Sequence, residues 1–143
     1  MILVDANLLI YAQFTVYREH ARARDWLDEQ FANGTRIGLP WVSLLAFLRV
    51  TTNPRYFPNA QSIDSAWTQV QSWLDQPSAW IPQPTERHGE VLAALLIGTP
   101  APGDLVPDAH LAALAIEHDL TVCTNDRDFA RFPKVRWLNP LAA

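Results

Sequence analysis

The seven residues Met1-Ile2-Leu3-Val4-Asp5-Ala6-Asn7 contain the pattern that decides the fold. Ile2 to Val4 form a short, continuous apolar run, which is typical of a strand buried on both faces. Asp5 follows this run directly, and a polar step separates it from the next apolar group, Leu8-Leu9-Ile10. The segment therefore predicts a buried strand that enters a helix or a loop, with a carboxylate at the end of the strand.

Beyond this segment, short strand-like runs alternate with stretches of helical spacing. Further strands are predicted at 36–39, 80–81, 120–124 and 135–138, and helices at 17–31, 41–50, 62–74, 85–97 and 107–118. Ser62 is a suitable cap for the third of these helices, and the breaker-rich stretch 98–103 predicts a loop. Such alternation implies crossover connections, so we expect an α/β fold with a mostly parallel sheet covered on both faces.

The same patterns predict which side chains are buried. Residues 41–50 are apolar nearly all round, so this helix should be buried. Trp26, Trp67 and Trp73 lie on predicted core faces, because aromatic residues at helical spacing usually pack in the core. Cys123, the single cysteine, lies within an apolar run and is predicted to be a small core residue.

Length and composition exclude several classes of protein. The 143 residues, 49% hydrophobic and 18% charged, are expected to form one domain over 1–143 and not a disordered chain. The apolar runs are far shorter than the ~20 residues of a transmembrane helix, and no signal-peptide pattern occurs, so no membrane association and a cytoplasmic location are expected. The net charge of −4 argues against a surface coated in basic residues, but not against a nucleic-acid enzyme with its acids in a metal site.

Three acids fall where strands end or helices begin. Asp5 ends the first strand, Asp126 follows the strand at 120–124, and Asp108 opens the helix that leads into that strand. Each has an ordinary explanation, since Asp5 could cap a helix, Asp108 could favour a helix N-terminus, and Asp126 or Asp128 could form a turn. Together, acids without paired Cys or His favour Mg²⁺ or Mn²⁺ over Zn²⁺, which points to phosphodiester or phosphoryl chemistry.

The sequence resembles the PIN-domain ribonucleases, and more closely the VapC-type toxins of bacterial toxin–antitoxin pairs. The resemblance rests on residues 1–7, on Asp108-Ala109-His110-Leu111-Ala112-Ala113-Leu114-Ala115 and on Thr124-Asn125-Asp126-Arg127-Asp128-Phe129, in the family's order and spacing. It implies an α/β/α sandwich and endonucleolytic cleavage of single-stranded or loop RNA at a Mg²⁺ or Mn²⁺ site. It also implies a homodimer and an antitoxin whose C-terminal segment wraps the active site.

The resemblance assigns roles to individual residues. Asp5 and Asp108 match the leading metal ligands and Asp126 the third acid, while Asn7, Thr124 and Asp128 match supporting positions. Many family members also carry a glutamate shortly before an arginine such as Arg49, but here Ala46 or Phe47 occupies that place. A single bound ion is then as reasonable an expectation as two. Asp104 could compensate if its loop folds inward, although a solvated loop acid is the simpler interpretation.

Positive charge is expected at the rim of an acidic site that binds RNA, because the acids repel the phosphates. Arg49, Arg127 and Arg131 are the candidates for this role. A second charge run, with Arg18, Arg22 and Arg24 among acidic neighbours, is interpreted as a solvated helix face.

Two other interpretations compete with a nuclease. In the first, the missing glutamate marks a decayed active site, and the domain only binds RNA or a partner. In the second, Asp5 is a phospho-acceptor in a receiver or haloacid-dehalogenase fold. Asp5-Ala6-Asn7 lacks the second acid of the dehalogenase signature, and no strand-end lysine suits a receiver.

Overall fold

The computed structural model of the protein describes residues 1–98, 100 and 103–142, and the loop predicted at 98–103 therefore lies partly outside the described residues. In chain order the elements are β1 (Ile2–Val4), α1 (Ala6–Gln13), α2 (His20–Ala32), β2 (Ile37–Gly38), α3 (Trp41–Thr51), α4 (Ile63–Leu74), β3 (Ala79–Trp80), α5 (His88–Ile97), η1 (Gly103–Leu105), α6 (Val106–His118), β4 (Thr121–Cys123), η2 (Arg127–Arg131) and β5 (Trp137–Leu138).

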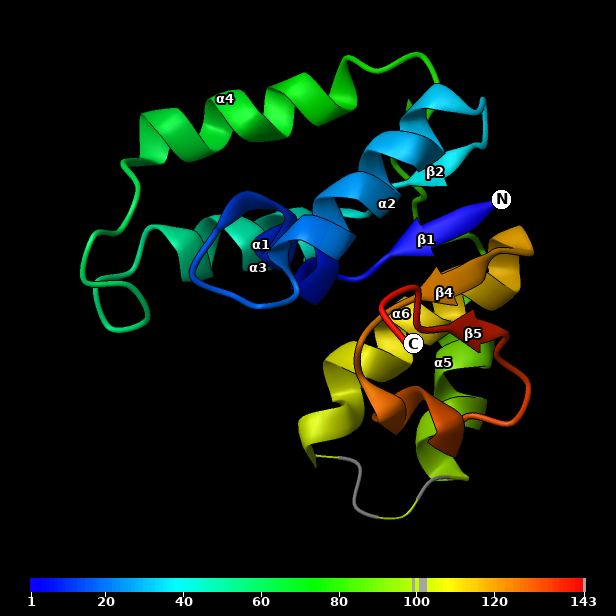
Figure 1. Ribbon diagram of the computed structural model, residues 1–143. Coiled ribbons are helices and arrows are strands. Elements are labelled where there is room, and N and C mark those ends of the chain that lie inside the picture. Colours follow the sequence, from blue (N-terminus) through cyan, green and yellow to red (C-terminus); the bar gives the residue numbers. More distant parts are fainter. Residues whose placement is uncertain (99, 101–102, 143) are drawn as a thin grey trace.

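The sheet is entirely parallel, with the strand order β3-β2-β1-β4-β5. The first strand of the chain is therefore the central one (Figure 1). From β1 the chain extends the sheet on one side through β2 and β3, and then returns to the other side of β1 to form β4 and β5. The predicted parallel sheet is confirmed. Its strand order changes sides at β1, because β2 and β3 lie on one side of this strand and β4 and β5 on the other.

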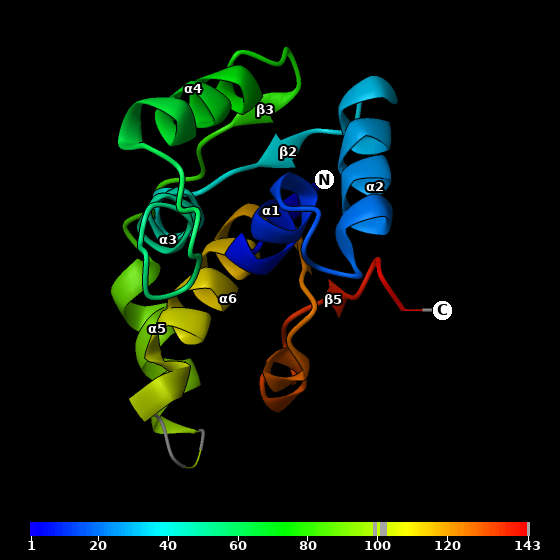
Figure 2. The same ribbon diagram turned by 60° about the vertical axis from the view of Figure 1, so that its left-hand side comes forward.

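The helices form two layers, one on each face of the sheet. Leu3 pairs with Val122 and packs under α5 and α6, whereas Val4 pairs with Cys123 and packs under the first four helices. Neighbouring residues of a strand point to opposite faces, so both apolar residues of each pair are buried. Figure 2 shows α2 on the opposite side of the strands from α5 and α6. The three-layer α/β/α arrangement expected from the resemblance is confirmed.

The helices lie close to the predicted ranges. Ser62 caps α4 as expected, because its hydroxyl accepts a hydrogen bond from the Ser65 backbone N–H at 3.1 Å. The helix predicted from residue 85 begins only at His88. Cys123 is 1% exposed, as predicted, and burial raises the pKa of its thiol to about 12. None of the helices in the described part of the chain is long and apolar enough to cross a lipid bilayer.

Two burial predictions were wrong. The α3 helix is not buried all round, because Leu45 on its outer side is 58% exposed. Trp67 is not a core residue either, since 44% of its surface is exposed. α4 packs through Ala66, Val70 and Trp73, which leaves Trp67 at the margin of this face, where its ring stacks on Trp41 at 6.5 Å. A helix on the outside of a small domain buries only the stripe that faces the rest of the domain, even when its other faces carry apolar residues.

A buried hydrogen bond ties α3 to the end of the central strand. The Ser43 hydroxyl, in a residue that is 2% exposed, donates to the Val4 carbonyl oxygen at 2.7 Å. Val4 is the residue directly before Asp5. This bond therefore fixes the backbone from which the Asp5 carboxylate projects.

We predict that Ser43→Ala lowers the free energy of unfolding by about 1–2 kcal/mol, because the Val4 carbonyl loses a buried donor. Urea denaturation measures this change. Ser72→Ala, at an exposed position of α4, is the matched control and should leave stability within about 0.5 kcal/mol of the wild type. Equal stability of both variants would contradict a structural role for the Ser43 hydroxyl.

Candidate active site

The predicted acids gather at the carboxyl ends of β1 and β4. In open parallel sheets, ligands bind where connections from neighbouring strands diverge to opposite faces. Here β1 leads to α1 on one face, while β4 is fed by α6 from the other. Asp5 follows β1, Asp126 follows β4, and Asp108 lies in the first turn of α6. The sheet order therefore brings Asp5 close to acids that lie more than a hundred residues later in the sequence.

The Thr124 hydroxyl joins the two strand ends. It donates to Asp5 Oδ2 at 2.8 Å, and it accepts from the Asp126 backbone N–H at 3.0 Å and from Asn7 Nδ2 at 3.2 Å. Thr124 is fully buried. The other Asp5 oxygen accepts from the Ala6 backbone N–H at 2.7 Å, so Asp5 also caps α1. The ordinary cap role and the place in the acid cluster thus coexist in one residue.

Two asparagines extend this network to the turn after β4. Asn7 Oδ1 accepts from the Asn125 backbone N–H at 3.1 Å. Asn125 Oδ1 in turn accepts from Asn139 Nδ2 at 2.9 Å. The turn that carries Asp126 is therefore held from both sides, by the end of β1 and by the segment after β5.

Asp108, Asp126 and Asp128 each offer an oxygen, and these three oxygens lie within 4.8 Å of one another. The Asp126 carboxylate also accepts from the Asp128 backbone N–H at 2.9 Å, which fixes the turn between them. A set of carboxylate oxygens at these separations fits one hard divalent cation such as Mg²⁺ or Mn²⁺. Asp128 thus lies among the acids that could share an ion, although the sequence suggested only a supporting position for it.

The crowded acids perturb one another. Burial raises the pKa of Asp108 to about 7, with further contributions from the charges of Asp126, Asp5 and Asp128. Burial also raises the pKa of Asp5, although the Thr124 and Ala6 donors oppose the increase. A cluster that disfavours its own ionisation is suited to binding a cation, because the cation removes the repulsion.

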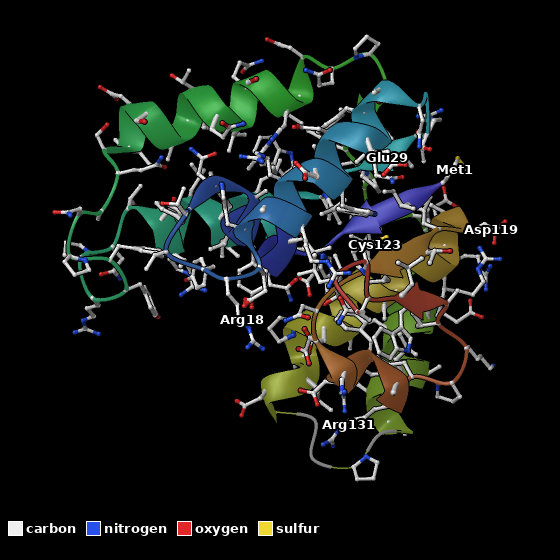
Figure 3. The ribbon with its side chains drawn as sticks, viewed as in Figure 1. Met1, Arg18, Glu29, Asp119, Cys123 and Arg131 are labelled. Atoms are coloured by element: carbon white, nitrogen blue, oxygen red, sulfur yellow. The ribbon has the colours of Figure 1, made fainter. Side chains whose placement is uncertain are left out.

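The remaining predicted residues lie on η1, α3 and η2. Asp104 is exposed on η1, and it is not among the described acids that come close enough to share one ion. Arg49 is exposed on α3, and Arg127 is exposed on η2. Arg131, also on η2 (Figure 3), lies 3.6 Å from the Asp128 carboxylate.

The burial of Ala46 and Phe47 indicates which of them stands in the place of the missing glutamate. Phe47 is fully buried, and its ring packs edge-on against Trp73 at 4.8 Å, within the core between α3 and α4. Ala46, by contrast, is partly exposed. We infer that Ala46 occupies the place of the glutamate, and α3 itself contains no acidic residue.

Sequence reasoning missed part of the site. The pattern at 124–129 suggested Thr124 only as a support, yet its hydroxyl contacts three groups of the site. The signal was a threonine at the end of an apolar strand, where a buried hydroxyl needs partners. Asn139 gave no signal, because its role depends on the path of the chain after β5.

Comparisons with known proteins agree with this geometry. The PIN domain family matches residues 2–135. Ribonuclease VapC37 of Mycobacterium tuberculosis is 44% identical over 142 residues, which cover 99% of each chain. Ribonuclease VapC43 of the same species is 40% identical over 141 residues, which cover 99% of this chain and 96% of that protein.

A solved structure has a similar fold at low sequence identity. The structure of VapBC2 from Rickettsia felis, bound to a DNA fragment from their promoter, matches with a TM-score of 0.67 and 17% identity. The match covers 97% of this chain and 98% of the other. At this identity the likeness supports the fold alone.

The raised pKa of Asp108 predicts how stability depends on pH. The folded state binds this proton up to a pKa of about 7, whereas an ordinary aspartate releases it near 3.8. Ionisation of Asp108 therefore destabilises the metal-free fold progressively as the pH rises from about 4 to 7. We predict that Asp108→Asn, in EDTA, matches the wild-type midpoint of thermal unfolding at pH 4 and exceeds it by a few degrees at pH 7.5.

Asp28→Asn, at an exposed position of α2, is the matched control and should show no such pH-dependent gain. A difference between Asp108→Asn and the wild type that is the same at both pH values would contradict the assigned pKa.

Proposed function

This chain belongs to the PIN-domain family, as a member of its VapC group, and we propose that it is a metal-dependent endoribonuclease, the toxin of a toxin–antitoxin pair. The observation that carries the proposal is the acid cluster of Asp108, Asp126 and Asp128, with Asp5 beside it. The cluster lies at the carboxyl ends of β1 and β4, where the strand order of the sheet changes sides. The substrate we propose is single-stranded or loop RNA, whose unpaired bases and bent backbone can reach a compact site.

We propose Mg²⁺ or Mn²⁺ as the ion, held by carboxylates from the predicted set of Asp5, Asp108 and Asp126 together with Asp128. A bound ion of this kind supplies an activated water and stabilises negative charge on phosphoryl oxygens. Since α3 contributes no carboxylate, one ion accounts for Asp108, Asp126 and Asp128, the described acids whose oxygens lie within 4.8 Å of one another.

The protein's own groups have distinct tasks in this proposal. Asp108 loses its proton before its carboxylate can act as a ligand, because its pKa is about 7. Asp5 is held by Thr124 and the Ala6 N–H, so its carboxylate is oriented before any substrate arrives. Asn7 and Thr124 position the turn that carries Asp126. Hydrolysis with in-line attack of water should leave 5′-phosphate and 3′-hydroxyl ends.

We propose that the toxin works with two protein partners, a second copy of itself and a cognate antitoxin. Leu45, Ile63 and Trp67 on α3 and α4 are 58%, 58% and 44% exposed, and exposed apolar side chains of this size suit a protein contact. VapC37 and VapC43, which match this chain nearly end to end, are named as VapC ribonucleases, and this supports a toxin of the VapC type.

The nuclease proposal predicts metal-dependent cleavage of RNA. Purified protein, freed of any copurified partner, is incubated with a pool of structured and single-stranded RNAs in Mg²⁺, in Mn²⁺ or in EDTA. We expect fragments with 5′-phosphate ends that EDTA abolishes, and a loss of rate of at least about a hundredfold in Asp108→Asn. Asp28→Asn should cleave at the wild-type rate.

Cleavage by Asp108→Asn at the wild-type rate, or cleavage that resists EDTA, would contradict the proposed site. Absence of cleavage by folded, partner-free wild type across the pool would favour the alternative, a decayed module that binds RNA or a partner. The replacement of the glutamate by Ala46 would then mark where catalysis was lost.

The homodimer proposal is checked separately by light scattering. We expect the antitoxin-free protein at micromolar concentration to have twice the mass of one chain. Trp67→Glu should shift it toward the monomer, because a charge would enter an apolar contact. A monomeric wild type over this range would contradict the homodimer and leave the nuclease proposal intact.

A further inference from the structure

A hollow of about 640 Å³ lies beside the acid cluster, on the side of α1 and α2. Its lining residues are Tyr11, Arg18, Glu19, Arg22, Asn125 and Leu141. They come from α1, the connection to α2, α2 itself, the turn after β4 and the C-terminal segment. The volume lies within the range of protein sites for small organic ligands, so it can take a nucleotide-sized group.

The hollow and the site share the turn after β4 through Asn125. This residue directly precedes Asp126, and its backbone N–H donates to Asn7 in the site network. Its side chain forms part of the wall of the hollow, where Asn125 Nδ2 lies 3.5 Å from the Tyr11 hydroxyl. Asn125 therefore connects the wall of the hollow to the turn that carries Asp126.

The residues that line the hollow include two arginines and one glutamate, so their charges sum to +1. The Arg18 side chain is 96% exposed and lies 3.6 Å from Glu19, the one acid among the lining residues. Arg22 donates to the Ala142 carbonyl oxygen, a neutral acceptor, at 3.3 Å, and it forms no ion pair with the residues that the structure describes. Figure 3 shows Arg18 projecting from the α1–α2 connection, and Arg131, on η2, lies next to Asp128 in the cluster itself.

RNA phosphates need such a cationic surface. The carboxylates of the site repel every phosphate that approaches within a Debye length, about 8–10 Å. Guanidinium groups compensate this repulsion and match phosphate oxygens in two-point contacts. Arg18 and Arg22 can supply these guanidinium groups outside the acid cluster, where they do not compete with a cation for the carboxylates.

We propose that this hollow binds the RNA segment that flanks the scissile phosphate, with Arg18 and Arg22 contacting its phosphates. The proposal rests on the nuclease function and adds the path of the substrate. It differs from the expectation that Arg49, Arg127 and Arg131 provide the basic rim. It also gives a binding role to part of the α2 charge run that the sequence presented as a solvated face.

The test measures RNA binding apart from cleavage. A fluorescent single-stranded 12-nucleotide RNA is titrated with Asp108→Asn protein in Mg²⁺, so that the RNA stays intact, and anisotropy gives the Kd at several salt concentrations. The substitutions Arg18→Gln and Arg22→Gln are then combined in this Asp108→Asn protein. We expect Kd to rise about tenfold, and the slope of log K against log salt to fall by about 1.4 for two lost phosphate contacts on a single strand.

Two control variants separate charge from structure. Arg24→Gln, at an exposed position of α2 where Arg24 pairs with Asp25, should leave Kd and slope unchanged. Arg18→Lys with Arg22→Lys keeps both charges and should keep most of the salt slope. Thermal unfolding of each variant checks that loss of the Arg22 contact to Ala142 has not disrupted the fold.

The outcomes distinguish this proposal from the nuclease itself. A Kd and salt slope within twofold of the parent would overturn the binding role of the hollow, even if the wild type cleaves RNA. Arginine-dependent binding of a 12-residue polyglutamate peptide, without an effect on RNA, would also overturn it and assign the hollow to an acidic protein segment. Arginine-dependent RNA binding without cleavage by the wild type would support the hollow and contradict the nuclease proposal.

Discussion

The buried Thr124 hydroxyl is the contact on which the arrangement of the site depends. It lies where the central strand β1 and its neighbour β4 end side by side, and it links Asp5, after β1, to the backbone of Asp126, after β4. A fully buried hydroxyl needs partners for its donor and acceptor sites, and here the partners are the groups of the site itself. The same bonds that satisfy the interior therefore set the positions of the acids.

The acid cluster combines two kinds of support. Asp5 and Asp126 are held by backbone N–H groups and by Thr124, so their carboxylates have little freedom. Asp108 comes from α6, a helix of the other layer, and burial raises its pKa to about 7, with further contributions from the charges of Asp126, Asp5 and Asp128. The metal-free fold thus keeps a strained electrostatic arrangement that binding of a cation would relax, as is common at functional sites.

Much of this architecture was predictable from local patterns. Apolar runs that end in polar residues located β1 and β4, helical spacing located most of the helices, and the strand-end acids identified the site region. The burial of Leu45 and Trp67 was predicted wrongly. Periodicity shows which faces of a helix are apolar, but not how much of the helix surface its neighbours cover. The partners of Thr124 and the hollow beside Asn125 depend on contacts between segments distant in sequence, and no local pattern contains them.

The central position of β1 has a consequence for the time at which the protein acquires its site. Its first neighbour β2 follows within 40 residues, but its other neighbour β4 begins only at residue 121. At synthesis rates of about 5–20 residues per second, several seconds to about 20 s separate the emergence of Asp5 from that of Asp126. A growing chain therefore holds an incomplete set of acids until Asp126 and Asp128 have been made, so the proposed metal site cannot form on a shorter nascent chain.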